Sequence, residues 1–91
     1  KMIHKYKIAY IEWEDSESGR QGWKSIEDSI TPLTHCISCG FIVYTTKTSI
    51  IVTSHLAPLS DDTVDIQGDL TIPKSAIKSI TYLKLPKIVK K

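Results

Sequence analysis

The chain contains none of the motifs that identify the common enzyme classes. It has no G-x-S-x-G nucleophile elbow, and no G-x-x-x-x-G-K-[ST] or G-x-G-x-x-G loop to bind phosphates. Its three histidines and its many serines form no recognisable nucleophile–base pattern. We therefore expect a protein that is not an enzyme, with no catalytic residue and no cofactor.

Long apolar runs, low-complexity blocks and internal repeats are also missing. No segment approaches the ~20 consecutive apolar residues of a membrane-spanning helix, and the first residues lack the apolar region of a secretion signal. A chain of 91 residues has the size of one small domain. We therefore expect a single cytoplasmic domain over residues 1–91, with no membrane partner.

The only two cysteines are Cys36 and Cys39, which suits free thiols in a reducing compartment. In an extended strand, residues three apart project to opposite faces, and their Cα atoms lie ~10 Å apart. A disulfide needs Cα atoms within ~7 Å of each other. His35 and His55 would raise the number of possible zinc ligands to four, but His35 and Cys36 also diverge. We predict two structural thiols and no metal site.

The small net charge of +2 hides a strong separation of charge. Residues 8–83 carry all ten acidic side chains and only five basic ones, whereas residues 1–7 and 84–91 carry seven lysines and no acid. Proteins that grip a nucleic-acid backbone usually place a basic stripe on their folded surface. The acidic folded part therefore makes RNA a less favoured partner. The basic tails, at about 1–5 and 86–91, are expected to be solubilising ends.

Two extended segments joined by a tight turn form the clearest pattern in the sequence. Apolar and polar residues alternate strictly over residues 64–73, as in an antiparallel strand with one face in a core and one in water. Pro73 ends this strand, residues 74–77 turn sharply, and residues 78–85 resume an extended run. The apolar side of the first segment consists of Val64, Ile66, Gly68, Leu70 and Ile72.

Three earlier segments, residues 6–13, 34–44 and 50–56, also have the composition of strands. The first is apolar on both faces, so we expect one face in the core and the other covered by a partner subunit. Its two faces are Ala9, Ile11 and Trp13 on one side and Tyr6, Ile8 and Tyr10 on the other. The expected inward residues of the other two strands are Ile37, Cys39, Phe41 and Val43, followed by Ile50, Val52 and Leu56.

A short helix is expected after the first strand. Trp23, Ile26 and Ile30 follow one another at helical spacing. Pro32 ends the pattern, which predicts two helical turns over residues 23–30 that cover one end of a barrel. Five strands, one short helix and the tight final turn together predict an all-β protein, a small five-stranded SH3-like or Sm-like barrel.

The most promising side chains for ligand binding lie in loops. Two tryptophans flank a glycine-containing loop that also carries an aspartate and an arginine, and such rings and guanidinium groups bind bases and phosphates. The turn after Pro73 exposes backbone N–H groups of the kind that bind anions. The alternative is that both rings cover the ends of the barrel and that the lysine of the turn is only solvated. The candidate ligand-binding residues are Trp13, Asp15, Arg20, Trp23, Lys47, Lys74 and Ser75.

Four short motifs, taken in order and with their spacing, resemble a family of short phage- and prophage-encoded proteins of unassigned function. They are W-x-D at Trp13-Glu14-Asp15, G-W at Gly22-Trp23, a small-residue-glycine step at Ser38-Cys39-Gly40, and I-P-K-x-x-I at residues 72–77. The resemblance covers about residues 6–85. It implies a phage accessory protein that acts in the cytoplasm of a bacterial host and binds other molecules without catalysis.

Small oligomeric phage proteins sequester the nucleotide signals of host immunity, and the resemblance implies a role of this kind. We expect a homo-oligomeric module that binds a small nucleotide-type ligand between subunits, as an anti-defence sponge. A tryptophan would stack on the base, Asp15 would accept from the ribose or base edge, and Arg20, Lys47 and Lys74 would meet phosphates. Two alternatives stay open: an Sm-like ring that binds RNA, and an inhibitor that binds a host protein.

Overall fold

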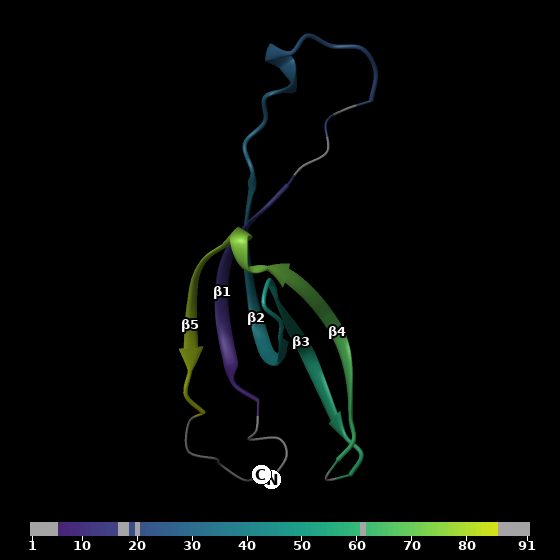
Figure 1. Ribbon diagram of the computed structural model, residues 1–91, viewed down its shortest axis with the longest axis vertical. Helices are drawn as coiled ribbons and strands as arrows, with labels where there is room; N and C mark the ends of the chain where they lie inside the picture. The colour runs from purple at the N-terminus through teal and green to yellow at the C-terminus, as the bar shows by residue number, and fades with distance from the viewer. Residues whose placement is uncertain (1–5, 17–18, 20, 61, 86–91) are drawn as a thin grey trace, which may run out of the picture.

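The described residues fold into one antiparallel sheet of five strands (Figure 1). The computed structural model describes residues 6–16, 19, 21–60 and 62–85. The strands are β1 (Ile8–Asp15), β2 (Thr34–Thr45), β3 (Ser49–Pro58), β4 (Val64–Pro73) and β5 (Ile77–Leu83), with single 3-10 turns at η2 (Glu27–Ser29) and η3 (Lys74–Ala76). Across the sheet the order is β4-β3-β2-β1-β5.

The predicted all-β class with five strands is confirmed. β4 spans the predicted residues 64–73, where alternation favours an extended backbone and Pro73 ends the run. The predicted tight turn is η3, in which the N–H of Ile77 donates to the Lys74 carbonyl. β3 is rich in β-branched residues, whose side chains fit a pleated, half-buried surface.

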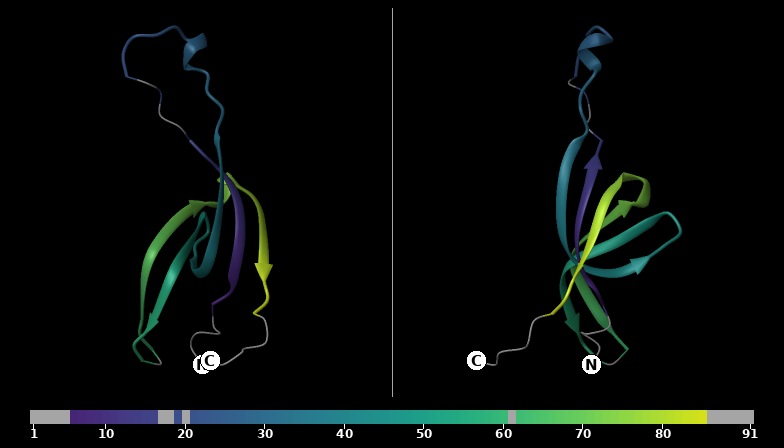
Figure 2. Two further views of the ribbon diagram at one scale, coloured as in Figure 1. Left: turned by 180° about the vertical axis from the view of Figure 1, so that it is seen from behind. Right: turned by 90° about the vertical axis from the view of Figure 1, so that its left-hand side faces the viewer.

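The sheet is bent, but its hydrogen-bonded ladder is open. Among the described residues, β4 pairs only with β3, and β5 pairs only with β1. Register shifts at Glu12/Trp13 and between Ile42 and Tyr44 add twist, as β-bulges do. η3 carries the chain from one edge strand to the other at one end of the sheet (Figure 2). The observed architecture is an open sheet, and its closure into an SH3-like or Sm-like barrel stays a prediction.

A small hydrophobic core fills the inside of the bend. β1 contributes Ala9, Ile11 and Trp13, which pack with Val52 of β3 and Ile72 of β4. The inward position predicted for Val52 is confirmed. Half-buried residues of β2, η3 and β5 complete the cluster, namely Cys36, Ile42, Ala76, Ile77 and Ile80. The core therefore connects all five strands.

β2 turns the opposite face toward the core from the one predicted. Cys36, Ser38 and Gly40 stand opposite the buried side chains of β1, so small residues lie inward. Space inside is limited by the indole of Trp13 and by the backbone of β3, and a Cβ on Gly40 would clash with the carbonyl oxygen of Thr53. The prediction of a core face made of Ile37, Cys39, Phe41 and Val43 is therefore wrong.

The two cysteines lie on opposite faces of β2, as predicted. Cys36 packs against the core, Cys39 is exposed, and both thiols are free. In the part of the chain that the structure describes, no three His, Cys, Asp or Glu side chains are grouped so that they could hold a metal ion.

The segment between β1 and β2 extends away from the sheet as an arm, defined here as residues 21–33 (Figures 1 and 2). The predicted helix over residues 23–30 is absent, and only the single turn η2 forms there. The prediction that this segment covers one end of the barrel is also wrong, because Trp23, Ile26 and Ile30 are 105%, 81% and 78% exposed.

The helical spacing of the apolar residues does not by itself produce a helix, because an isolated helix of this length has marginal stability without a surface to pack on. η2 is held by the Ser29 N–H, which donates to the Ile26 carbonyl at 3.0 Å, and by the Ser25 hydroxyl, which accepts from the Asp28 N–H at 3.2 Å.

Among the described residues, no helix has the length and the apolar character needed to span a membrane.

Candidate binding site

Trp13 belongs to the core. Its side chain is only 8% exposed, and its indole Nε1–H donates to the Ser38 hydroxyl across the β1–β2 pair at 3.0 Å. A buried indole normally satisfies its N–H in this way while its rings fill apolar space. In this conformation the ring is enclosed by the sheet and presents no free face on which a base could stack.

The Trp13–Ser38 hydrogen bond should contribute measurably to stability. We expect a double-mutant cycle of Trp13→Phe and Ser38→Ala to give a coupling free energy of about 1 kcal/mol, since a net hydrogen bond is worth about 0.5–1.5 kcal/mol. Urea unfolding of the four proteins measures it. Strictly additive losses would show that the hydrogen bond contributes nothing.

Two other predicted site residues, Trp23 and Asp15, lie on the arm and at its base. Trp23 is fully exposed on it. Asp15 lies at the end of β1, where its Oδ1 accepts the N–H of Ser16 at 2.9 Å and thus fixes the start of the loop. Arg20 lies outside the described residues. The exposed Trp23 and the buried Trp13 therefore do not form one site inside the chain.

Lys47, Lys74 and Ser75 come together from distant parts of the sequence. The backbone N–H of Lys74 donates to the carbonyl of Thr48 at 2.8 Å, and Ser49 pairs with Pro73 where β3 meets β4. The β2–β3 turn therefore lies directly against η3. We name residues 46–48 together with η3 the basic turn pair.

The β2–β3 turn is fixed by its own hydroxyl groups. Thr46 Oγ1 accepts the N–H of Ser49 at 2.9 Å and that of Thr48 at 3.2 Å. Both lysines of the basic turn pair are exposed, and among the described residues neither Lys47 nor Lys74 forms an ion pair. The basic turn pair thus presents two exposed ammonium groups and the Ser75 hydroxyl on a backbone held in place by hydrogen bonds.

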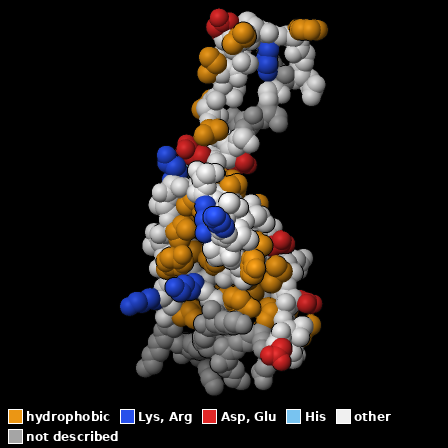
Figure 3. Space-filling model, in the orientation of Figure 1, with side chains coloured by type: hydrophobic (Ala, Val, Ile, Leu, Met, Phe, Trp, Pro, Cys, Tyr) orange, Lys and Arg blue, Asp and Glu red, His pale blue; other side chains and the backbone are white. Residues whose placement is uncertain are grey.

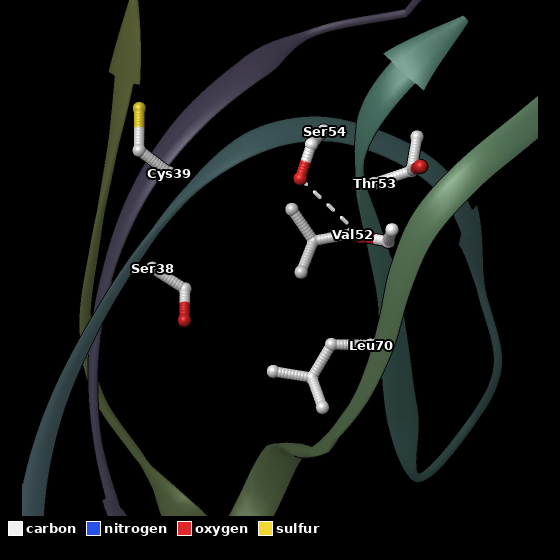
Figure 4. Close-up of a pocket in the computed structure, with 7 residues that line it drawn as sticks. Ser38, Cys39, Val52, Thr53, Ser54 and Leu70 are labelled. Carbon is white, nitrogen blue, oxygen red and sulfur yellow. Dashed lines mark hydrogen bonds between the residues drawn. The ribbon is translucent and has the colours of Figure 1, made fainter.

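A separate hollow of about 210 Å³ lies between β2, β3 and β4 (Figure 4). Ser38 and Ser54 bring hydroxyl groups beside the apolar side chains of Val52 and Leu70, and the Ser54 hydroxyl donates to the Gly68 carbonyl at 3.4 Å. No charged side chain lines the hollow. Ligand pockets usually span about 300–1,000 Å³, so this hollow is too small and too neutral for a nucleotide.

Sequence reasoning did not identify this hollow, although one signal was present. Gly68 interrupts a strand pattern, and it adopts a positive φ of 73° that side chains rarely tolerate. A glycine inside a strand often marks a bulge or a close approach of another group. Here the approaching group is Ser54 of the neighbouring strand.

Comparisons with protein-family models, with curated proteins and with solved structures find no match to this chain.

Proposed function

We propose that this protein is a non-enzymatic, oligomeric binding module that holds a small anionic ligand of the nucleotide type at the basic turn pair. One observation carries the proposal: the Lys74 N–H···Thr48 bond of 2.8 Å brings two lysines onto neighbouring turns, and neither lysine forms an ion pair with another described residue. Lysine binds phosphate groups as a compact point charge. Ser75 adds a hydroxyl donor beside them.

The arm supports the oligomeric part of the proposal. Trp23 is exposed, while Trp13 is enclosed in the core. The arm extends beyond the end of the sheet, so its exposed ring is placed to contact a neighbouring copy (Figure 1). This arrangement supports a module made of more than one copy.

The biological setting of the proposal comes from the resemblance to short phage proteins. In that setting the module is an anti-defence sponge that sequesters a nucleotide signal in the cytoplasm of a bacterial host. The strand order β4-β3-β2-β1-β5, with η3 between the two edge strands, supports an SH3-like or Sm-like barrel that closes at this end.

Titration calorimetry against cyclic and linear nucleotides tests the proposal. We expect the Lys47→Ala/Lys74→Ala double variant to raise the Kd at least about tenfold, which corresponds to 1.4 kcal/mol of lost binding free energy. Lys78→Ala is the matched control, because Lys78 already pairs with Glu14 at 3.5 Å and its loss should leave the Kd unchanged. Absence of heat with every nucleotide would refute the proposal.

The same titration with an oligoribonucleotide separates the RNA-binding alternative. RNA binding by a basic surface weakens steeply as salt rises, because counterions are released from the phosphate backbone. The exposed face of β4 carries Asp65 and Asp69, which oppose such binding. We therefore expect the oligonucleotide to bind more weakly than the preferred mononucleotide or dinucleotide.

A further inference from the structure

The arm presents a set of apolar side chains that no other described residue covers. Trp23, Ile26, Ile30 and Leu33 are all exposed, and Figure 3 shows apolar side chains gathered toward the tip of the arm. Single exposed apolar residues are ordinary, whereas several of them gathered on one short segment indicate an interaction site. The η2 turn adds the two acidic residues Glu27 and Asp28 to the same surface.

A complementary groove lies at the opposite end of the sheet. This terminal groove, about 410 Å³ in volume, is lined by apolar and basic residues and by no acid. One basic group is anchored over an aromatic ring, since Lys7 Nζ lies 5.2 Å from the centre of the Tyr82 ring. The lining residues are Tyr6, Lys7, Ile8, Tyr82, Leu83, Lys84 and Leu85.

The arm and the terminal groove match in chemistry. The arm combines a tryptophan and aliphatic side chains with two carboxylates, and the groove combines two tyrosines and aliphatic side chains with two ammonium groups. Aromatic side chains supply much of the binding energy at the centre of protein interfaces. Charges of opposite sign around such a contact set its register and exclude wrong partners.

A chain cannot place its arm in its own groove. The arm leaves the sheet where Asp15 pairs with Thr34, whereas the groove lies where Ile8 pairs with Leu83, at the other end of β1. The arm points away from that end, along the longest dimension of 58 Å (Figures 1 and 2). An arm that fills this groove would therefore belong to a different molecule.

We infer that the arm of one copy docks in the terminal groove of a second copy, with Trp23 against the tyrosine-lined surface and Glu27 and Asp28 facing Lys7 and Lys84. In the simplest closed arrangement, two copies lie antiparallel and exchange arms through two identical contacts. Two contacts double the buried surface, and standard interfaces bury about 800 Å² per partner. The inference rests on the oligomer of the proposed function but not on its ligand.

Sedimentation equilibrium and native mass spectrometry test this contact on the full chain. We expect the wild type to be oligomeric and Trp23→Ser/Ile26→Ser to weaken self-association at least about 100-fold, because the interface loses its central aromatic anchor. Leu59→Ser is the matched control, since Leu59 is also exposed but lies in the β3–β4 connection, and it should leave self-association unchanged.

Charge reversal provides a second test that a folding defect cannot imitate. Glu27→Lys/Asp28→Lys and Lys7→Glu/Lys84→Glu should each weaken self-association about tenfold, and an equimolar mixture of the two proteins should recover it. Circular dichroism confirms that each variant is folded. If self-association recovers in the mixture but in neither protein by itself, the contacting arm and groove belong to different molecules.

The outcomes separate the interface from the rest of the proposal. A wild type that is monomeric at all concentrations overturns both the arm contact and the oligomeric part of the proposed function. If self-association is unchanged in every arm variant, the arm contact is wrong but the oligomeric part of the proposed function stands. The same conclusion holds if the arm binds only a different host protein. Nucleotide titration of the wild type reports on the ligand independently of these results.

Discussion

Replacing Ile11 by alanine is expected to lower the free energy of unfolding by about 3 kcal/mol, the usual size of the loss when a buried isoleucine is truncated. Ile11 is 0% exposed and lies in the middle of β1, between Ser38 of β2 and Ile80 of β5. Loss of its side chain leaves a cavity that the paired strands on both sides cannot close. Since small domains are stable by only about 5–15 kcal/mol, this is a large fraction of the total.

Urea unfolding followed by circular dichroism measures the loss for Ile11→Ala. The matched control is Ile66→Ala, which makes the same chemical change on the edge strand β4, where the side chain is 41% exposed. We expect the control to cost less than about 1 kcal/mol, because most of the removed surface already meets water. Equal losses at the two positions would show that the core does not lie where the structure places it.

Replacing Gly40 by alanine is expected to destabilise the protein by about 3 kcal/mol, at the upper end of the cost of overpacking. The added Cβ would clash with the backbone carbonyl of Thr53 and come within 3.0 Å of Val52 Cγ2. A carbonyl in a paired strand cannot rotate away as a side chain can. The change therefore forces β2 and β3 apart at Gly40.

Gly19→Ala is the control for this substitution. A Cβ on Gly19 meets only the end of the flexible Lys24 side chain, which can move aside. We expect the midpoint of thermal unfolding to fall by many degrees for Gly40→Ala and to change little for Gly19→Ala. A Gly40→Ala protein as stable as the wild type would contradict the close approach of the two strands.

The strands were predictable because their signals are local. Alternation over residues 64–73 and the proline that follows them specify β4 from neighbouring residues alone, and the observed strand has the same bounds. The two faces assigned to the first strand were also informative, because Ala9, Ile11 and Trp13 do form one buried row. A two-residue period survives any arrangement of the sheet in which one face is buried.

The core face of β2 was not predictable in the same way. Apolar side chains occur on both faces of β2, so hydrophobicity alone does not show which face lies in the core. Because side chains alternate between the faces, an assignment that is shifted by one residue places the wrong face inward. The deciding facts are the indole of Trp13 and the backbone of Thr53, which lie on other strands. Only small side chains fit between these groups and β2.

The candidate site shows the same limit. Each lysine of the basic turn pair was recognisable as a turn residue, but their closeness depends on one backbone hydrogen bond between Lys74 and Thr48. The prediction of a helix in the arm was wrong for a related reason. The prediction of a helix from the spacing of Trp23, Ile26 and Ile30 assumed a surface to pack against, and the described residues supply none.

The place of β1 between β2 and β5 also has a consequence for how the protein is made. Ile8 of β1 pairs with Phe41 of β2 on one side and with Leu83 of β5 on the other. During synthesis, one edge of β1 therefore has no strand to pair with until β5 has left the ribosome. Proteins dominated by such distant pairings fold on the order of milliseconds to seconds. The nascent chain therefore offers chaperones an apolar strand that the finished molecule keeps hidden.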